Sequence, residues 1–277
     1  MKPQKRNSRE WESMLKLIAS DIDGTLLQNG KRELSLQAVE QIKQLKEMGI
    51  LFAAASGRQY AVLRNLFEPV KDDIAYICEN GAMVVYKGKI LHKDVFERAL
   101  AEEMAHSILN REDMEIIVSG EKSYYIQPKR KAFADYMLQT VKGKVAVVDD
   151  IFKVKEDILK ISMYRESGLE EMLPYWKKLF GSQATVVTSG HAWLDMMPMS
   201  ADKGKGIRVL QKHFLISADA CAAFGDNLND LEMLHEVTYS FAVSNAKEEV
   251  KETAKYETER VETVLEKIIQ QGGNWNE

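Results

Sequence analysis

The chain has 277 residues, of which 45% are hydrophobic and 29% are charged, and its formal net charge at pH 7 is −4. This length allows one large domain or two modest domains with proper cores. The slightly acidic balance argues against a nucleic-acid-binding protein, which would present a basic surface, so an anionic ligand has to be attracted locally by a few cationic side chains.

No apolar run approaches the roughly 18 residues that a membrane-spanning helix needs, so we expect no membrane partner. Residues 1–9 are basic and polar and lack the apolar segment of a secretory signal, which predicts a frayed N-terminal extension and a cytoplasmic protein. Cys78 and Cys221 each lie inside an apolar run and lack the spacing of a metal site. We therefore predict buried free thiols, with a disulfide between them as the alternative.

The first third of the chain alternates short apolar runs with segments of helical period. The runs at 15–20, 50–55 and 74–78 show no alternation, which is typical of strands buried on both faces of a parallel sheet. Apolar positions recur at helical spacing after Ser35, a predicted N-cap, and again from Leu63 to Phe67. Strands that alternate with helices in this way predict a parallel α/β sheet.

The pattern changes near residue 84. From there to residue 192 the apolar runs are shorter and more alternating, and helix-like segments lie between them. This pattern predicts an inserted α+β domain with an antiparallel sheet. The strand-like runs are 115–118, 124–127 and 145–148, and the helix-like segments are 100–109 and 169–180.

The first pattern then returns and continues to the end of the chain. Asn245, followed three residues later by Glu248, predicts a helix N-cap with a capping box. The expected elements are a helix at 205–214, buried strands at 220–224 and 239–243, and a final helix that carries Val261 and Ile268.

The fold class that we predict is therefore α/β, with a Rossmann-like parallel-sheet core and an inserted α+β domain. The core would consist of residues 1–83 and 193–277, and the insertion of residues 84–192.

Several predicted parallel strands end in polar residues that a buried strand does not need. In open α/β sheets, ligands bind at the carboxyl ends of the strands. Carboxylates gathered at that edge would repel one another without a cation, and Mg²⁺, which prefers oxygen ligands, would relieve the repulsion. Lys203, next to the predicted helix at 205–214, supplies a positive charge for phosphate. The residues at strand ends are Asp21 and Asp23 after the first strand, Ser56 after the second, and Asp226 with Asp230 after the late strand.

These residues lie in four ordered motifs that together resemble the haloacid dehalogenase superfamily of phosphatases. The order of the motifs, and the insertion between the second and the third, are similar to the Cof-type subfamily with its α+β cap of type IIB. The resemblance covers nearly the whole chain and is strongest outside the insertion. The sequence departs from the family pattern at Ser244, where a glycine is usual, and at 259–261, where Asp-Gly-Val is usual. The motifs are Asp-Ile-Asp-Gly-Thr-Leu at 21–26, Ala-Ala-Ser-Gly-Arg around Ser56, Asp-Lys-Gly around Lys203, and Gly-Asp-Asn-Leu-Asn-Asp at 225–230.

The resemblance implies a role for each motif residue. Asp21 would attack the phosphorus atom and form an aspartyl-phosphate, and Asp23 would protonate the leaving oxygen and later activate water. For the metal, Asp23 would contribute its backbone carbonyl, and Asp230 would orient metal-bound water. The predicted phosphate-binding residues are Ser56, Gly57, Lys203 and Asn229, and the predicted Mg²⁺ site consists of Asp21, Asp23, Asp226 and Asp230.

Some of these residues have an alternative interpretation. Ser56 also fits an N-cap of the following helix. Lys205 and Lys212 are rivals of Lys203 for contact with phosphate, although both fit solvated positions. Arg58 fits either a surface ion pair or a contact with substrate.

The function that the resemblance implies is Mg²⁺-dependent hydrolysis of a small phosphomonoester. Sugar phosphates are the leading substrate class, ahead of pyridoxal phosphate and flavin-type phosphates. The alternatives are a phosphosugar mutase of the same superfamily and a non-catalytic regulator that binds a phosphometabolite. A regulator would be expected to lack the nucleophile or the acid, whereas Asp21 and Asp23 are both present. The sequence leaves open whether the protein is a monomer or a homodimer.

Overall fold

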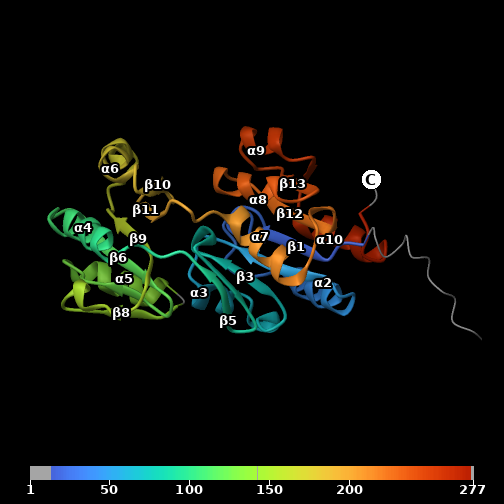
Figure 1. Cartoon of the computed structure of the whole chain (residues 1–277), viewed down its shortest axis with the longest axis horizontal. Coiled ribbons are helices and arrows are strands. Elements are labelled where there is room, and N and C mark those ends of the chain that lie inside the picture. The colour runs from blue at the N-terminus through green and yellow to red at the C-terminus, as the bar shows by residue number, and fades with distance from the viewer. Residues whose placement is uncertain (1–13, 142, 276–277) are drawn as a thin grey trace, which may run out of the picture. The chain divides into compact units, whose positions relative to one another are not determined.

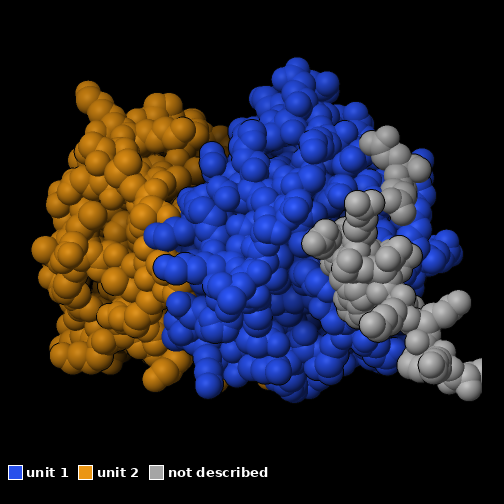
Figure 2. All heavy atoms as spheres, turned by 45° about the vertical axis from the view of Figure 1, so that its right-hand side comes forward, with its two compact units in different colours: residues 1–56, 66–91, 202–277 blue, residues 57–65, 92–201 orange. Residues whose placement is uncertain are grey.

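The computed structural model describes residues 14–141 and 143–275, so the prediction for residues 1–9 lies outside the described residues. Contacts between Cα atoms divide the chain into two compact units, which Figure 2 shows in different colours. Unit 1 comprises residues 1–56, 66–91 and 202–277, and unit 2 comprises residues 57–65 and 92–201.

The described part of unit 1 is built on a sheet of eight strands (Figure 1). The strands are β1 (Leu17–Asp21), β2 (Leu51–Ala55), β3 (Ala75–Cys78), β4 (Met83–Tyr86), β5 (Lys89–Lys93), β12 (Cys221–Gly225), β13 (Tyr239–Val243) and β14 (Tyr256–Thr258). Their order across the sheet is β14-β13-β12-β1-β2-β3-β4-β5. The six strands from β14 to β3 pair in parallel, and β4 pairs antiparallel with β3.

Helices cover the parallel part of this sheet, which explains the burial of its central strands. Every residue of β1 and β12 is buried. Ser35 caps the first helix, because its hydroxyl accepts a hydrogen bond of 3.0 Å from the Ala38 N–H. None of the helices in the described ranges has the length and apolar character needed to cross a bilayer. The described helices of unit 1 are α2 (Leu36–Glu47), α7 (Lys203–Phe214), α8 (Leu231–His235), α9 (Glu248–Thr253) and α10 (Val261–Gln270), and α3 (Tyr60–Leu66) lies in unit 2 except for its last residue.

The strand order reverses between β1 and β12. From β1 the chain moves outward through β2 to β3, and from β12 it moves the other way through β13 to β14. Connections between parallel strands are right-handed, so the two halves place their helices on opposite faces. In agreement, α2 packs with α10, while α7 packs with α8. The boundary between β1 and β12 is therefore the topological switch point, where open α/β sheets bind ligands.

Unit 2 contains a second sheet, and its described strands are β6 (Glu115–Gly120), β7 (Tyr124–Ile126), β8 (Val145–Val147), β9 (Ile158–Tyr164), β10 (Ala184–Thr188) and β11 (Trp193–Pro198). Their order is β10-β11-β9-β6-β7-β8. Helices α4 (Arg98–Leu109) and α6 (Leu173–Phe180) share one apolar core with the sheet, which includes Ile161 and Trp176. Helix α5 (Lys131–Thr140) places Phe133 in a separate cluster with Ile117 and Ile126.

The strand pairing differs from the predicted domain boundaries at both ends of the insertion. Strands β4 and β5, most of which the sequence analysis placed in the insertion at 84–192, extend the sheet of unit 1. Strand β11, which it placed in the core at 193–277, pairs with β9 and β10 in unit 2. The difference arises because a short alternating strand has the same sequence pattern at the edge of a mixed sheet as in an antiparallel sheet.

Two local expectations are also corrected. The inserted sheet is not wholly antiparallel, because β8 pairs in parallel with β7 across the connection that α5 provides. Asn245 is not the N-cap of α9, a position that Lys247 occupies. The Asn245 amide instead donates a hydrogen bond of 2.9 Å to the Gly24 carbonyl, which draws it toward the loop after β1.

The two cysteines are free and buried, as predicted. Cys78 ends β3 and Cys221 begins β12, so two other strands lie between them in the sheet. Burial raises the pKa of Cys78 well above its usual range and raises the pKa of Cys221 to about 11.

We expect neither thiol of the folded protein to react promptly with a disulfide reagent at about pH 8, since the thiolate is the reactive form. Thiol titration before and after denaturation measures this directly. Both thiols should react after denaturation, and rapid modification of either one in the folded protein would contradict the buried positions.

Candidate active site

Asp21 lies at the centre of the candidate site, at the carboxyl end of β1 and at the switch point of the sheet. Its side chain is buried, and its Oδ2 has no hydrogen-bond partner among the described residues. Burial, which disfavours the charged carboxylate, raises the pKa of Asp21 well above its ordinary value, while the nearby Lys203 ammonium acts in the opposite direction. The site thus holds a carboxylate with one buried oxygen atom available to a ligand.

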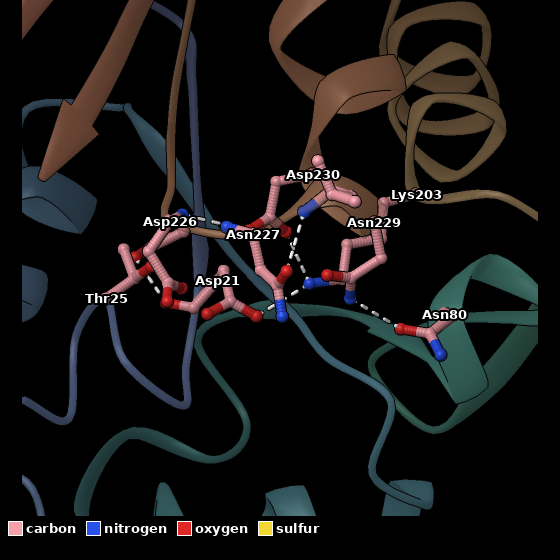
Figure 3. Close-up of polar contacts among 10 residues, drawn as sticks. Asp21, Thr25, Asn80, Lys203, Asp226, Asn227, Asn229 and Asp230 are labelled. Atoms are coloured by element: carbon pink, nitrogen blue, oxygen red, sulfur yellow. Dashed lines mark hydrogen bonds and ion pairs between the residues drawn. The ribbon is translucent and has the colours of Figure 1, made fainter. Parts of the chain in front are cut away.

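Lys203 provides the positive charge of the site. It is the first residue of α7, its side chain is fully buried, and its Nζ lies 2.6 Å from Asp21 Oδ1 and 2.6 Å from Asp230 Oδ1 (Figure 3). Burial alone would lower the pKa of Lys203, but the two carboxylates outweigh burial and raise it above its ordinary value. Lys203 is therefore a fixed cation between two aspartates, whereas its predicted rival Lys205 is only half-buried.

Asp230 holds the loop that follows β12. Its Oδ2 accepts hydrogen bonds of 3.0 Å from the N–H groups of Asp226 and Asn227, and Asn227 and Asp230 cap each other reciprocally. Both oxygens of Asp230 therefore already accept hydrogen bonds. The Asn-Leu-Asn-Asp sequence carries the signal of this capping box, which our sequence analysis missed.

The loop after β1 packs directly against Asp226. Thr25 Oγ1 donates a hydrogen bond of 2.7 Å to Asp226 Oδ1, which counteracts the effect of burial in raising the pKa of Asp226. Gly24 has a φ of +97°, and a Cβ at that position would lie 2.3 Å from Asp226 Oδ2. Glycine is therefore required both by the backbone conformation and by the close approach of the carboxylate.

The other predicted site residues differ in their burial and in the unit to which they belong. Asp23 is exposed, two residues beyond the buried Asp21, and its backbone bridges to Leu27. Ser56 is buried after β2 in unit 1, whereas the adjacent Gly57 belongs to unit 2. The Asn229 amide donates a hydrogen bond of 3.0 Å to Asn80 Oδ1 (Figure 3).

The carboxylates of the site could hold a divalent cation. Asp21, Asp226 and Asp230 each offer a carboxylate oxygen, and these atoms lie within 4.8 Å of one another. Three carboxylates against one lysine leave an excess of negative charge, which a divalent cation would reduce. An oxygen-rich anionic set of this kind suits Mg²⁺.

The sequence matches the haloacid dehalogenase-like hydrolase family over residues 18–265. The chain belongs to this family. The match covers the candidate site and both units, so it confirms the resemblance that the four motifs predicted.

Relatives of this hydrolase include named phosphatases. The 5-amino-6-(5-phospho-D-ribitylamino)uracil phosphatase YbjI of Escherichia coli (strain K12) is 31% identical over 265 residues, which is 92% of this chain and 96% of that protein. Phosphatase YwpJ of Bacillus subtilis (strain 168) is 26% identical, over 87% of this chain and 93% of that protein. A crystal structure from Eubacterium rectale has a TM-score of 0.83 at 28% identity, and the match covers 92% of this chain and 99% of that one.

These matches confirm the predicted fold class and the predicted enzyme class, a phosphatase-type hydrolase of the haloacid dehalogenase superfamily. They favour an enzyme over the non-catalytic regulator that the sequence analysis held as an alternative.

Gly24→Ala of this hydrolase should be destabilised, and its stabilisation by added Mg²⁺ should be reduced, because a Cβ would displace the Asp226 carboxylate. Thermal unfolding with and without Mg²⁺ measures both effects. Gly30→Ala is the matched control, since Gly30 also has a positive φ of +69° but nothing within 4 Å of a Cβ. Gly30→Ala should lose only the backbone contribution of about 1–2 kcal/mol. Equal effects in the two variants would contradict the steric argument.

Proposed function

We propose that this hydrolase is a Mg²⁺-dependent phosphatase of small phosphomonoesters that acts through an aspartyl-phosphate on Asp21. The observation that carries the proposal is the contact of 2.6 Å between the fully buried Lys203 and Asp21 at the switch point of the sheet. The buried lysine favours the ionised carboxylate and so opposes the effect of burial on the Asp21 pKa, and an ionised carboxylate is the form that attacks phosphorus.

In this mechanism Asp21 attacks the phosphoryl group and the bond to the leaving oxygen breaks. Oδ2 is the attacking atom that the contacts favour, because Oδ1 is bound to Lys203 and Oδ2 has no hydrogen-bond partner among the described residues. Water then attacks the aspartyl-phosphate, releases inorganic phosphate and restores the carboxylate. The net reaction is hydrolysis of the ester.

Asp23 is the proposed general acid and base. It would donate a proton to the leaving oxygen in the first step and accept one from the attacking water in the second. Its exposure supports this role, because the leaving group and the water both have to reach it from solvent. A buried carboxylate such as Asp230, with both oxygens already bonded, could not exchange protons in this way.

The proposed phosphate contacts are Ser56, Gly57, Lys203 and Asn229. Lys203 has three N–H donors, and two of them bond to Asp21 and Asp230, so one remains for a phosphoryl oxygen. Preorganised charge of this kind is the main means by which phosphoryl transfer is accelerated. The contact of Asn229 with Asn80 holds the Asn229 side chain and would orient it for a similar role.

Asp21 and Asp226 are the proposed direct ligands of Mg²⁺, with the Asp23 backbone carbonyl as a third. The bound ion would neutralise charge on the phosphoryl oxygens and reduce repulsion between the carboxylates. Asp230 Oδ1 accepts a hydrogen bond from Lys203, and its Oδ2 accepts hydrogen bonds from two backbone N–H groups. Its proposed role is therefore to position Lys203 and the loop after β12.

The proposed substrates are small phosphometabolites. Sugar phosphates remain the leading class, and 5-amino-6-(5-phospho-D-ribitylamino)uracil joins the panel because the relative named for it is 31% identical to this chain. Phosphate release from such a panel, with and without Mg²⁺, ranks the candidates. Isomerisation of sugar phosphates with little free phosphate would point to the mutase instead.

Asp21→Asn should lower turnover by about a thousandfold or more, because an amide cannot form the acyl-phosphate. Phosphate release under saturating Mg²⁺ is the measurement, with circular dichroism to verify folding. Asp72→Asn is the matched control, since Asp72 is exposed and precedes β3, at the opposite strand end from the site. Retained activity in Asp21→Asn would exclude the aspartyl-phosphate.

Asp226→Ala should require a higher Mg²⁺ concentration for half-maximal activity, by about tenfold or more, since a direct ligand is lost. The measurement is a titration of activity with Mg²⁺ at constant ionic strength. Thr25→Val removes only the hydrogen bond to Asp226 and should shift the titration less. An Asp226→Ala titration that matches the wild type would place the ion elsewhere.

A further inference from the structure

Two consecutive residues of the Ser-Gly-Arg motif are held by different units of the protein. The Ser56 N–H donates a hydrogen bond of 2.9 Å to the Ile77 carbonyl, and the Ser56 carbonyl accepts one of 2.9 Å from the Asn80 N–H, both within unit 1. The carbonyl of Gly57, in unit 2, accepts a hydrogen bond of 2.8 Å from Lys160 Nζ. The backbone is therefore fixed on both sides of the bond between Ser56 and Gly57.

Lys160 is an unusual residue for its position. It lies in β9 and is 5% exposed, and its strand neighbours Leu159 and Ile161 are fully buried apolar residues. Its Nζ lies 3.5 Å from Asp195 Oδ2, and Asp195 Oδ1 accepts a hydrogen bond of 2.5 Å from Ser162 Oγ. A buried ion pair is weak evidence for a role in stability, because apolar residues of similar size often stabilise a core at least as well. Lys160 also donates a hydrogen bond to the Gly57 carbonyl, which indicates a role in holding the backbone at Gly57.

The segment after Gly57 is held to the same unit by two more bonds. The Gln59 N–H donates a hydrogen bond of 3.0 Å to Tyr124 Oη, and Gln59 Nε2 donates one of 3.1 Å to the Gly120 carbonyl. Gly57 is the residue with the widest backbone freedom in this turn, since it lacks a Cβ. The bond from Lys160 to its carbonyl restricts that freedom.

We infer that Lys160 is a positioning residue for phosphate binding, which holds the Gly57 carbonyl in unit 2 and thereby fixes the turn between Ser56 and Gly57. The inference rests on the proposed function, in which Ser56 and Gly57 contact the phosphoryl group. In this proposal, strand β9 of unit 2 contributes to phosphate binding through the Gly57 carbonyl, and this role does not depend on a contact with the rest of the substrate.

The test is the inhibition constant of inorganic phosphate, measured with the Mg²⁺-loaded enzyme during hydrolysis of its best substrate. Inorganic phosphate has no leaving group, so its affinity reports the phosphate contacts alone. Lys160→Met should raise the inhibition constant about tenfold, as expected for the loss of a hydrogen bond from a charged donor. Lys153→Met is the matched control, because Lys153 lies in the same unit with its side chain 81% exposed, and it should leave the constant unchanged.

A second variant covers the loss of folding that an unpaired buried Asp195 could cause. Lys160→Met combined with Asp195→Asn removes both charges, and it should raise the inhibition constant while its melting temperature stays near that of the wild type. An unchanged inhibition constant in this folded double variant would overturn the inference. If only KM for the organic substrate then rose, Lys160 would contact the leaving group, and if neither constant changed, the pair would be purely structural.

Ser56→Ala separates this inference from the proposed function. If Ser56→Ala raises the inhibition constant and the Lys160 variants do not, the inference fails and the phosphate site stands. If Ser56→Ala also leaves the constant unchanged, the proposed phosphate site itself is wrong, and the inference fails with it.

Discussion

The interaction on which the site depends is the pairing of Lys203 with Asp21 and Asp230 inside the core of unit 1. A lysine with a fully buried side chain requires nearby carboxylates, and removal of one partner from a buried ion pair destabilises a protein by about 3–5 kcal/mol. The three residues come from β1, the start of α7 and the loop after β12. The two ion pairs of Lys203 therefore hold together three elements that are separate in the sequence.

The topology of the sheet explains why these elements meet. Because the strand order reverses between β1 and β12, the chain leaves their carboxyl ends in opposite directions and covers neither end with a crossing helix. Loops fill the edge instead, and each is fixed by a specific bond: Thr25 to Asp226, Asn245 to the Gly24 carbonyl, and Asn229 to Asn80. These hydrogen bonds preorganise the loops around the site, as the proposed electrostatic catalysis requires.

In unit 2, strand β9 carries buried polar residues on the face opposite to the apolar core that it shares with α4 and α6. Ile161 and Met163 of β9 point into the core with α4 and α6, whereas the alternate positions Lys160 and Ser162 carry the bonds to Gly57 and Asp195. The alternation of a strand allows one element to serve packing on one side and a polar network on the other. The proposed role of Lys160 uses this division.

The sequence by itself determined the fold class, the order of most strands and helices, and the family, because buried parallel strands and the four motifs carry strong local signals. It also singled out Asp21, Lys203 and Asp226, since the two aspartates lie where predicted strands end and the lysine lies next to a predicted helix. Only the tertiary structure decided that β4 and β5 belong to unit 1, that Asn245 holds a loop rather than capping a helix, and that Lys160 reaches Gly57. The contacts of Asn245 and Lys160 are with residues more than 80 positions away in the sequence. The placement of β4 and β5 depends on which of two sheets an alternating strand joins. A local sequence pattern carries neither kind of information.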